Sequence, residues 1–146
     1  MLICFLHTAT QFGGHYYTIM SNASSYAAAR QAAASMTYDG VRGYLATVDS
    51  APEYRFLSWV LRARNAYVSG SDVASEAAWV LTDGPKSGKS APYLPWSFGE
   101  PSGGVGQNCL ALSSADGVMD VSCSSGNMDY VVEFAGMYCL FFLACS

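Results

Sequence analysis

Residues 84–123 read GPKSGKSAPYLPWSFGEPSGGVGQNCLALSSADGVMDVSC, and the first part of this stretch limits the possible folds most strongly. Residues 84–107 hold four of the chain's five prolines and six of its glycines, a composition incompatible with a regular helix or strand. Loops of this length in compact domains are either functional or disordered. The segment also carries Tyr93, Trp96 and Phe98, which a disordered linker does not normally keep. We therefore predict an ordered loop with a small core of its own.

Side chains that carry oxygen gather in the second half of this stretch. They are Glu100, Ser102, Gln107, Asn108, Asp116 and Asp120. Calcium takes about six to eight oxygen ligands from carboxylates, amide and backbone carbonyls, and water. A calcium site and the ordinary polar decoration of a loop both explain this spacing, so spacing alone leaves the two interpretations open.

Length and composition predict one globular domain. The 146 residues are enough for one core of helices and sheet, and 51% apolar against 12% charged residues excludes a disordered chain. No apolar run approaches the roughly 18 residues that span a membrane. Whether the protein is anchored to a membrane is nevertheless left open. We expect the domain to cover residues 14–136. Residues 1–13 are interpreted as a remnant of a signal or upstream region, and residues 137–146 as an apolar tail.

Charge and motif content argue against nucleic-acid binding and against catalysis. The net charge is −4, and the seven basic residues are scattered, with Arg55, Arg62 and Arg64 as the one loose group. This distribution does not suit a phosphate backbone. The two histidines, His7 and His15, lack the spacing of zinc ligands, and no nucleophile is paired with a base. We therefore predict no nucleic-acid partner and no enzymatic activity.

Local patterns predict two helices followed mostly by strands. The alanine-rich run 25–36 begins with a serine suited to capping, and Ser50 with Glu53 forms a capping box at the start of a second helix. Short apolar stretches bounded by turn residues predict strands at 16–20, 44–48, 66–68, 78–81, 109–112, 118–122 and 130–134. Early helices combined with many short strands indicate an α+β domain.

Ordered blocks along the chain resemble the C-type lectin-like family. The blocks are residues 14–17, 29–33, 43–48, Glu53 with 56–57, 66–68, 71–72, Glu76, Trp79, 83–84, Trp96, 99–102, Cys109, 120–123 and 130–134. Each block is weak alone, but their order and spacing are specific. The resemblance implies an α+β, C-type lectin-like fold with two helices, small antiparallel sheets and a long ordered loop.

The five cysteines have a partial assignment by this resemblance. An odd number leaves at least one cysteine without an intrachain partner in a secreted protein. The family has a disulfide under the long loop, which the resemblance assigns to Cys109 and Cys123, and a second that ties the first helix to the last strand. Ala33 and Val132 replace the cysteines of the second bridge by position. Cys4, Cys139 and Cys145 stay unassigned, and free buried cysteines in a cytosolic protein are the alternative to the whole scheme.

The resemblance also implies a binding site. Sugar-binding members hold one calcium ion with a Glu-Pro-Asn triplet, a later acid and a Trp-Asn-Asp triplet, and sugar hydroxyls coordinate the same ion. Here Glu100, Ser102, Gln107 and Asp120 correspond to four of these ligands, and we expect them to bind both metal and carbohydrate. Met119 replaces an asparagine ligand and offers no oxygen, so calcium binding should be weak. A glutamate-first triplet implies a mannose-type preference and a cis peptide bond before Pro101.

These features predict a noncatalytic carbohydrate-binding module, weakly calcium-dependent, that is secreted or at the cell surface. Its expected partner is a glycan or glycoprotein. The alternative is a calcium-independent protein-binding or adhesion domain on the same fold. Asn22-Ala23-Ser24 is also a glycosylation sequon, placed before the first predicted helix, where exposure is expected.

Overall fold

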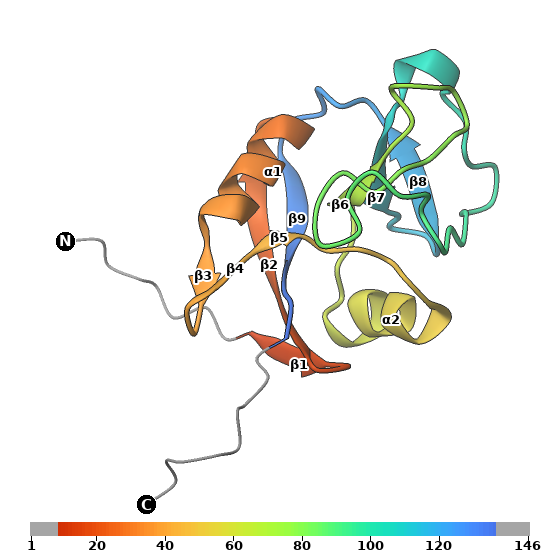
Figure 1. Ribbon diagram of the computed structural model, residues 1–146. Helices are drawn as coiled ribbons and strands as arrows, with labels where there is room; N and C mark the ends of the chain where they lie inside the picture. Colours follow the sequence, from red (N-terminus) through yellow and green to blue (C-terminus); the bar gives the residue numbers. More distant parts are fainter. Residues whose placement is uncertain (1–8, 137–146) are drawn as a thin grey trace, which may run out of the picture.

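The computed structural model describes residues 9–136 and contains two helices, one large sheet and one small sheet (Figure 1). The helices are α1 (Tyr26–Ser35) and α2 (Ala51–Arg55), and α2 continues into a π-helical turn, Phe56–Val60. The strands are β1 (Thr10–Phe12), β2 (His15–Ala23), β3 (Thr37–Tyr38), β4 (Val41–Arg42), β5 (Tyr44–Leu45), β6 (Ala66–Ser71), β7 (Cys109–Leu112), β8 (Val118–Val121) and β9 (Met128–Phe134). A short 3₁₀ turn covers Gly104–Gly106. The predicted α+β class is confirmed.

The large sheet joins distant parts of the chain. Its order is β1-β2-β9-β6-β7-β8, and β5 also pairs with β9, while β3 and β4 form a separate ribbon. Antiparallel pairing of Tyr16 with Phe134 closes the domain by bringing its first long strand to its last. The β6–β9 pair is parallel, with Ala66 opposite Asp129, whereas the other pairs are antiparallel. The β6–β9 pair connects the half that carries α1 to the half that carries the long loop (Figure 1).

Both helices begin where the capping residues predict. The Ser25 hydroxyl accepts a hydrogen bond from the Ala28 amide at 3.1 Å, and the Ser50 hydroxyl accepts one from the Glu53 amide at 3.3 Å. The Glu53 carboxylate reaches the amide of Asp49 at 2.7 Å, one residue before the amide that a standard capping box uses. These contacts satisfy amides that have no partner within the helix.

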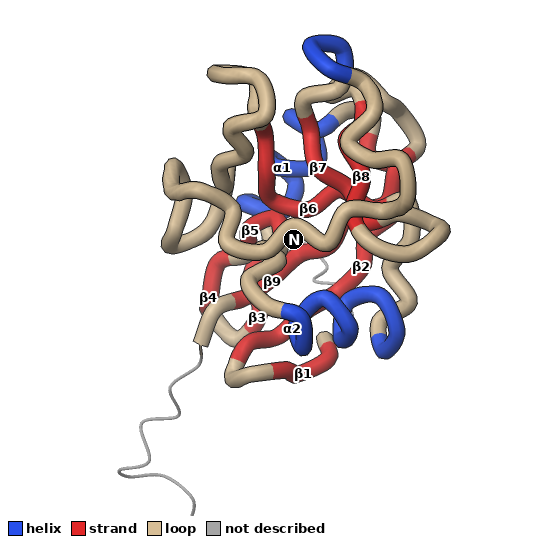
Figure 2. The backbone as a smooth tube through the Cα atoms, turned by 90° about the vertical axis from the view of Figure 1, so that its right-hand side faces the viewer, coloured by secondary structure: helices blue, strands red, loops and turns tan. Residues whose placement is uncertain are grey.

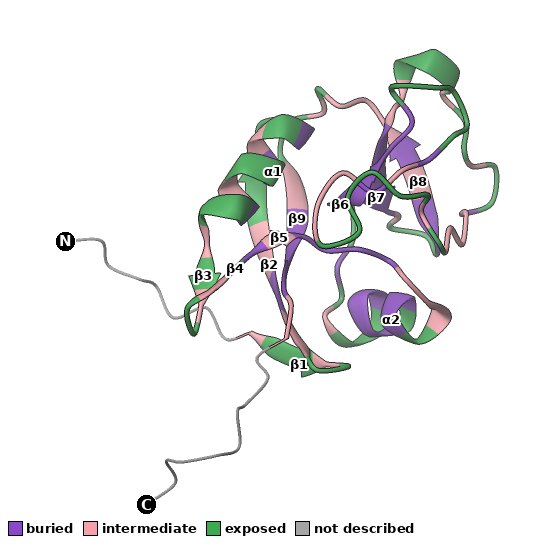
Figure 3. Ribbon diagram, viewed as in Figure 1, coloured by how far each residue is buried: buried purple, intermediate pink, exposed green. Residues whose placement is uncertain are grey.

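Helix α1 packs against the sheet through small side chains. Ala29 and Ala33 are fully buried, while the opposite face of the helix is exposed (Figure 3). A Cβ atom on Gly43 would lie 2.7 Å from Val132 Cγ1 and 2.8 Å from the Ala33 carbonyl oxygen. Ala33 and Val132, which by position replace the missing disulfide, are therefore both packed tightly around the same glycine.

Two of the predicted strands, 44–48 and 78–81, are shorter than expected, whereas β6 extends beyond its predicted end at residue 68. Residues 78–81 form only isolated bridges, in which Val80 pairs with Ser71 and Ser90, and the predicted strand 44–48 pairs only over β5. Beyond β5, the Ala46 amide donates to the Val131 carbonyl at 2.9 Å, so the backbone is satisfied without a continuous ladder. Figure 2 shows the long irregular segments that run beside β6, β7 and β8.

The predicted loop at residues 84–107 is ordered, but the prediction of a core of its own is wrong, because Tyr93 and Trp96 pack against the main core and Phe98 is fully exposed. Trp96 packs edge-to-face against Trp79 with ring centroids 5.3 Å apart, and both belong to the main core or its margin. The Ser97 amide donates to the Val118 carbonyl, which ties the loop to β8. Most of the predicted end segments, and with them Cys4, Cys139 and Cys145, lie outside the described residues. The folded part begins at least at Thr10, because β1 pairs with β2.

Candidate functional site in the long loop

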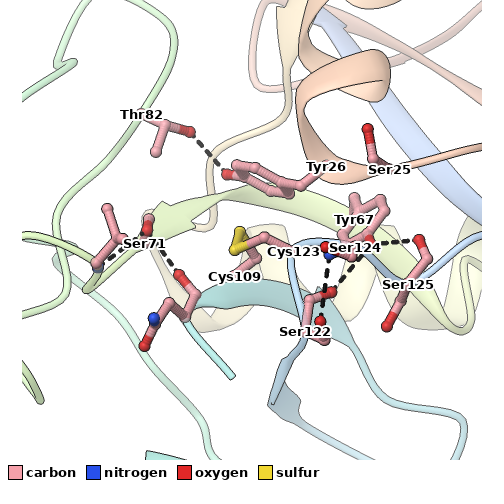
Figure 4. The surroundings of a disulfide bond; sticks show 12 residues. Ser25, Tyr26, Tyr67, Ser71, Thr82, Cys109, Ser122, Cys123, Ser124 and Ser125 are labelled. Carbon is pink, nitrogen blue, oxygen red and sulfur yellow. Dashed lines mark hydrogen bonds between the residues drawn. A yellow bond between two sulfur atoms is a disulfide. The ribbon is translucent and has the colours of Figure 1, made fainter. Parts of the chain in front are cut away.

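A disulfide anchors the base of the long loop. Cys109 and Cys123 are bonded, with Cα atoms 5.2 Å apart, which confirms the predicted pairing. The bond joins the start of β7 to the segment after β8, beside the rings of Tyr26 and Tyr67 (Figure 4). The Tyr67 hydroxyl donates to the Ser125 carbonyl at 2.7 Å and so fixes the segment that follows the bridge.

The four predicted site residues lie together above this base. The Ser102 hydroxyl is 3.3 Å from Glu100 Oε1 and 3.4 Å from Gln107 Oε1. The Asp120 carboxylate accepts hydrogen bonds from the backbone amides of Ser102 at 2.8 Å and Gly103 at 3.0 Å. The Glu100–Pro101 peptide bond is cis, as predicted. Residues before β7 therefore meet Asp120 of β8 at one point.

Gly103 is a site residue that the sequence motifs did not single out. Its amide binds Asp120, and a Cβ atom at this position would overlap the Gln107 side chain. The signal was the Gly103-Gly104 pair directly after Ser102, since glycine allows another group to approach the backbone closely.

The two carboxylates of the site have pKa values shifted in opposite directions. The pKa of Glu100 is raised, chiefly because its protonated carboxyl shares a hydrogen bond with Asp120 and also because of burial. Burial opposes ionisation of Asp120, but hydrogen bonds from Glu100, Ser102 and Gly103 outweigh it and lower the pKa of Asp120. The pair therefore favours one shared proton at acidic pH, with the charge on Asp120.

The loop site offers few uncommitted oxygens to a cation. Glu100 Oε2 is buried and receives no hydrogen bond from the described residues. Both oxygens of Asp120 are already engaged by backbone amides, and Met119 supplies no oxygen. Within residues 9–136, no group of three or more histidine, cysteine, aspartate or glutamate side chains could hold a metal ion. Ser102 and Gln107 would therefore have to complete the coordination with neutral oxygens.

The predicted sequon lies at the surface. Asn22 and Ser24 are both exposed, at the end of β2 where its pairing with β9 is irregular. Asn22 has a φ of 66°, a left-handed conformation that asparagine tolerates better than most residues. Glycosylation at Asn22 stays a prediction.

Two buried carboxylates outside the site have structural partners. Glu133 Oε1 lies 2.5 Å from His15 Nδ1, and its Oε2 accepts from the Thr47 amide at 3.0 Å. Glu53 accepts from the Tyr17 hydroxyl at 2.6 Å, and burial raises the pKa of Glu53. These bonds tie β2, β9 and the start of α2 together, and they involve none of the four residues of the loop site.

The architecture and the disulfide-anchored loop define a C-type lectin-like fold. The solved structures that share it include carbohydrate-recognition domains and antifreeze proteins at TM-scores of about 0.7, which confirms the fold that the sequence motifs implied. No family model matches the chain. Across the described residues, no helix combines the length and apolar character needed to cross a bilayer.

The carbohydrate-recognition domain of cow CD23, solved in the presence of a GlcNAc2Man3 oligosaccharide, is 23% identical, with a TM-score of 0.73 over 88% of this chain and 95% of that one. A calcium-independent type II antifreeze protein has a TM-score of 0.73 and 19% identity over 94% of this chain and 98% of its own. Halomucin of Haloquadratum walsbyi is 27% identical over an alignment of 137 residues, which covers 88% of this chain but only 2% of halomucin. The chain thus matches a small part of that protein.

Proposed function

We propose that this domain is a noncatalytic carbohydrate-recognition module whose binding site is formed by Glu100, Ser102, Gln107 and Asp120. The observation that carries the proposal is the contact of these residues with one another: the Ser102 hydroxyl lies beside Glu100 Oε1 and Gln107 Oε1, and the Ser102 amide donates to Asp120. The other oxygen of Glu100, Oε2, is buried and has no donor among the described residues. A buried carboxylate oxygen without a partner is costly unless a ligand satisfies it. The glycan or glycoprotein partner and a secreted or cell-surface location belong to the same proposal.

A calcium ion would supply the link between these oxygens and the sugar. Glu100 and Asp120 would carry the negative charge, and Ser102 and Gln107 would add neutral oxygens and hydrogen bonds to sugar hydroxyls. Two carboxylates place the expected calcium affinity at the weak end of the range, with a dissociation constant of about 1 mM or above. The glutamate-first triplet supports a preference for mannose-type hydroxyls.

The test is a glycan array probed with and without a calcium chelator, using wild type and Glu100→Gln. The substitution keeps the side-chain shape and removes one charge, so calcium-dependent binding should fall at least tenfold. Asp39→Asn is the matched control, because it removes one charge from an exposed turn between β3 and β4. Binding that persists unchanged in Glu100→Gln would exclude this site.

Calcium-independent recognition of a protein partner is the second candidate. It is favoured by Met119, which offers no ligand atom where the family motif has an asparagine, and by the engagement of both Asp120 oxygens with the loop backbone. This candidate predicts that calcium does not change the thermal stability and that no glycan is retained at millimolar calcium. A calcium-dependent rise in Tm with mannose-type binding would reject it.

A further inference from the structure

A groove on another part of the surface is lined with aromatic side chains. It has a volume of about 510 Å³ and lies between the α2 segment and the long loop. Trp59 of the π-helical turn is 63% exposed, and Phe98 of the long loop is fully exposed. Isolated exposed aromatic residues need no explanation, but these two line one groove from different elements, with the partly exposed Tyr93 between the same walls.

The walls of this groove are fixed by buried polar contacts. The Tyr54 hydroxyl donates to the Asp116 carboxylate, and the Gly117 amide donates to the Tyr54 oxygen. These bonds tie α2 to the turn between β7 and β8. The groove is thus formed before any ligand arrives, which lowers the entropic cost of binding.

The groove contains two charged side chains, Arg55 and Asp116, that can still form ion pairs or hydrogen bonds with a ligand. Arg55 lies one helical turn before Trp59, with its guanidinium carbon 5.9 Å from the centroid of the Trp59 ring. Arg55 is exposed and forms no ion pair with any described residue. One oxygen of Asp116 accepts a hydrogen bond from the Tyr54 hydroxyl, and the other oxygen has no donor among the described residues. A planar cation, an acceptor oxygen and aromatic faces therefore line the same groove.

We propose that this groove is a second binding site, which takes an acidic saccharide of the uronate type. The apolar face of a pyranose ring would stack on Trp59, with Phe98 on the opposite wall. The ring carboxylate would pair with the Arg55 guanidinium, whose planar donors match a carboxylate, and a ring hydroxyl would donate to Asp116. The site extends the proposed saccharide recognition, but it needs no calcium and uses none of the four loop residues.

The experiment is a calorimetric titration of the whole chain with a galacturonate trimer, with a galactose trimer as the uncharged comparison and a chelator throughout. We expect the galacturonate trimer to bind at least tenfold more tightly than the galactose trimer. Trp59→Ala should weaken galacturonate binding about tenfold. Arg55→Gln should remove the difference between the two trimers. Val60→Ala, next to Trp59, exposed and outside the groove, should change nothing.

This experiment can reject the groove proposal and the loop-site proposal independently of each other. Glu100→Gln should leave galacturonate binding in chelator unchanged, and loss of binding in that variant would place the ligand in the loop site instead. Equal affinity for both trimers, full affinity in Trp59→Ala, or no binding by the wild type would each overturn the groove proposal. A Tm of Trp59→Ala that matches the Tm of Val60→Ala checks that the rest of the domain keeps its packing.

Discussion

The two halves of the domain are held closed in different ways. At the loop end, where most of the chain is irregular, a disulfide between Cys109 and Cys123 and the carboxylate of Asp120 fasten the backbone. At the α1 end, where helix and strand are regular, Ala33 and Val132 pack around Gly43 with no covalent bond between them. The comparison indicates that regular elements can replace a cross-link by close packing, whereas a long loop has too few buried apolar contacts to do so.

The largest effect is expected from restoring the missing bridge. In Ala33→Cys with Val132→Cys, a disulfide would close a loop of about 100 residues, for which the chain-entropy estimate is about 4.7 kcal/mol. Engineered bridges fall short of that value when they distort the backbone, so it is an upper limit. Urea unfolding of the oxidised and reduced variant gives the gain directly. A loss of stability on oxidation would mean that the present packing cannot accept the bridge geometry.

Removing the existing bridge should have the next largest effect. Cys109→Ala with Cys123→Ala should lower the free energy of unfolding by about 3 kcal/mol, because the bridge closes a loop of about 15 residues in the unfolded chain. Urea denaturation measures this loss. Hydrogen exchange should show the added opening at residues 97–108 and at the start of α1, where the Tyr26 amide donates to the Cys123 carbonyl, and less at Ala33. Equal loosening at Ala33 would contradict the view that the two ends are held by different contacts.

Adding a methyl group at Gly43, where α1 contacts β9, should lower the free energy of unfolding by somewhat less. Gly43→Ala places a Cβ atom 2.7 Å from Val132 Cγ1 and 2.8 Å from the Ala33 carbonyl oxygen, so the helix must shift. Overpacking of this kind costs about 1–3 kcal/mol. Gly40→Ala is a poor control because Gly40 has a φ of 79°, whereas Gly106→Ala adds a Cβ atom that meets nothing within 4 Å. Thermal unfolding of Gly43→Ala beside Gly106→Ala isolates the packing effect.

The smallest expected effect is the pH dependence of the stability that Asp120 and Glu100 contribute to the long loop. The pKa of Asp120 is lowered in the folded state, so its hydrogen bonds stabilise the protein above its ordinary value of 3.8, and this contribution is lost as the pH falls through the lowered pKa. The raised pKa of Glu100 acts in the opposite sense, since its contribution is present below 4.5 and lost as the pH rises. At pH 7, Asp120→Asn should cost about 1–2 kcal/mol.

Denaturant titrations of wild type and Asp120→Asn from pH 7 to pH 2 check this prediction. The difference between the two proteins should shrink as the pH falls below 3.8. Glu100→Gln serves as the paired variant because it leaves the two backbone amides bonded to Asp120. A difference that stays constant across the range would show that Asp120 contributes through its shape and not its charge.

The sequence by itself determined the class of fold and two features of the long loop, its disulfide and its cis peptide bond. Capping residues placed the starts of both helices, and the order of short blocks carried the resemblance that implied the C-type lectin-like fold, the Cys109–Cys123 bond and the cis bond before Pro101. These features depend on local chemistry, on the residue type at each position and on motif spacing, all of which can be read along the chain.

Only the tertiary structure decided which distant groups share a surface or a bond. It engaged both oxygens of Asp120 with backbone amides, and it placed Trp59 and Phe98 on the walls of one groove. It also shortened the predicted strands around Val80, where the loop takes the hydrogen bonds instead. Such outcomes depend on contacts between residues far apart in the chain, and hydrophobic period and local propensity carry no information about those contacts.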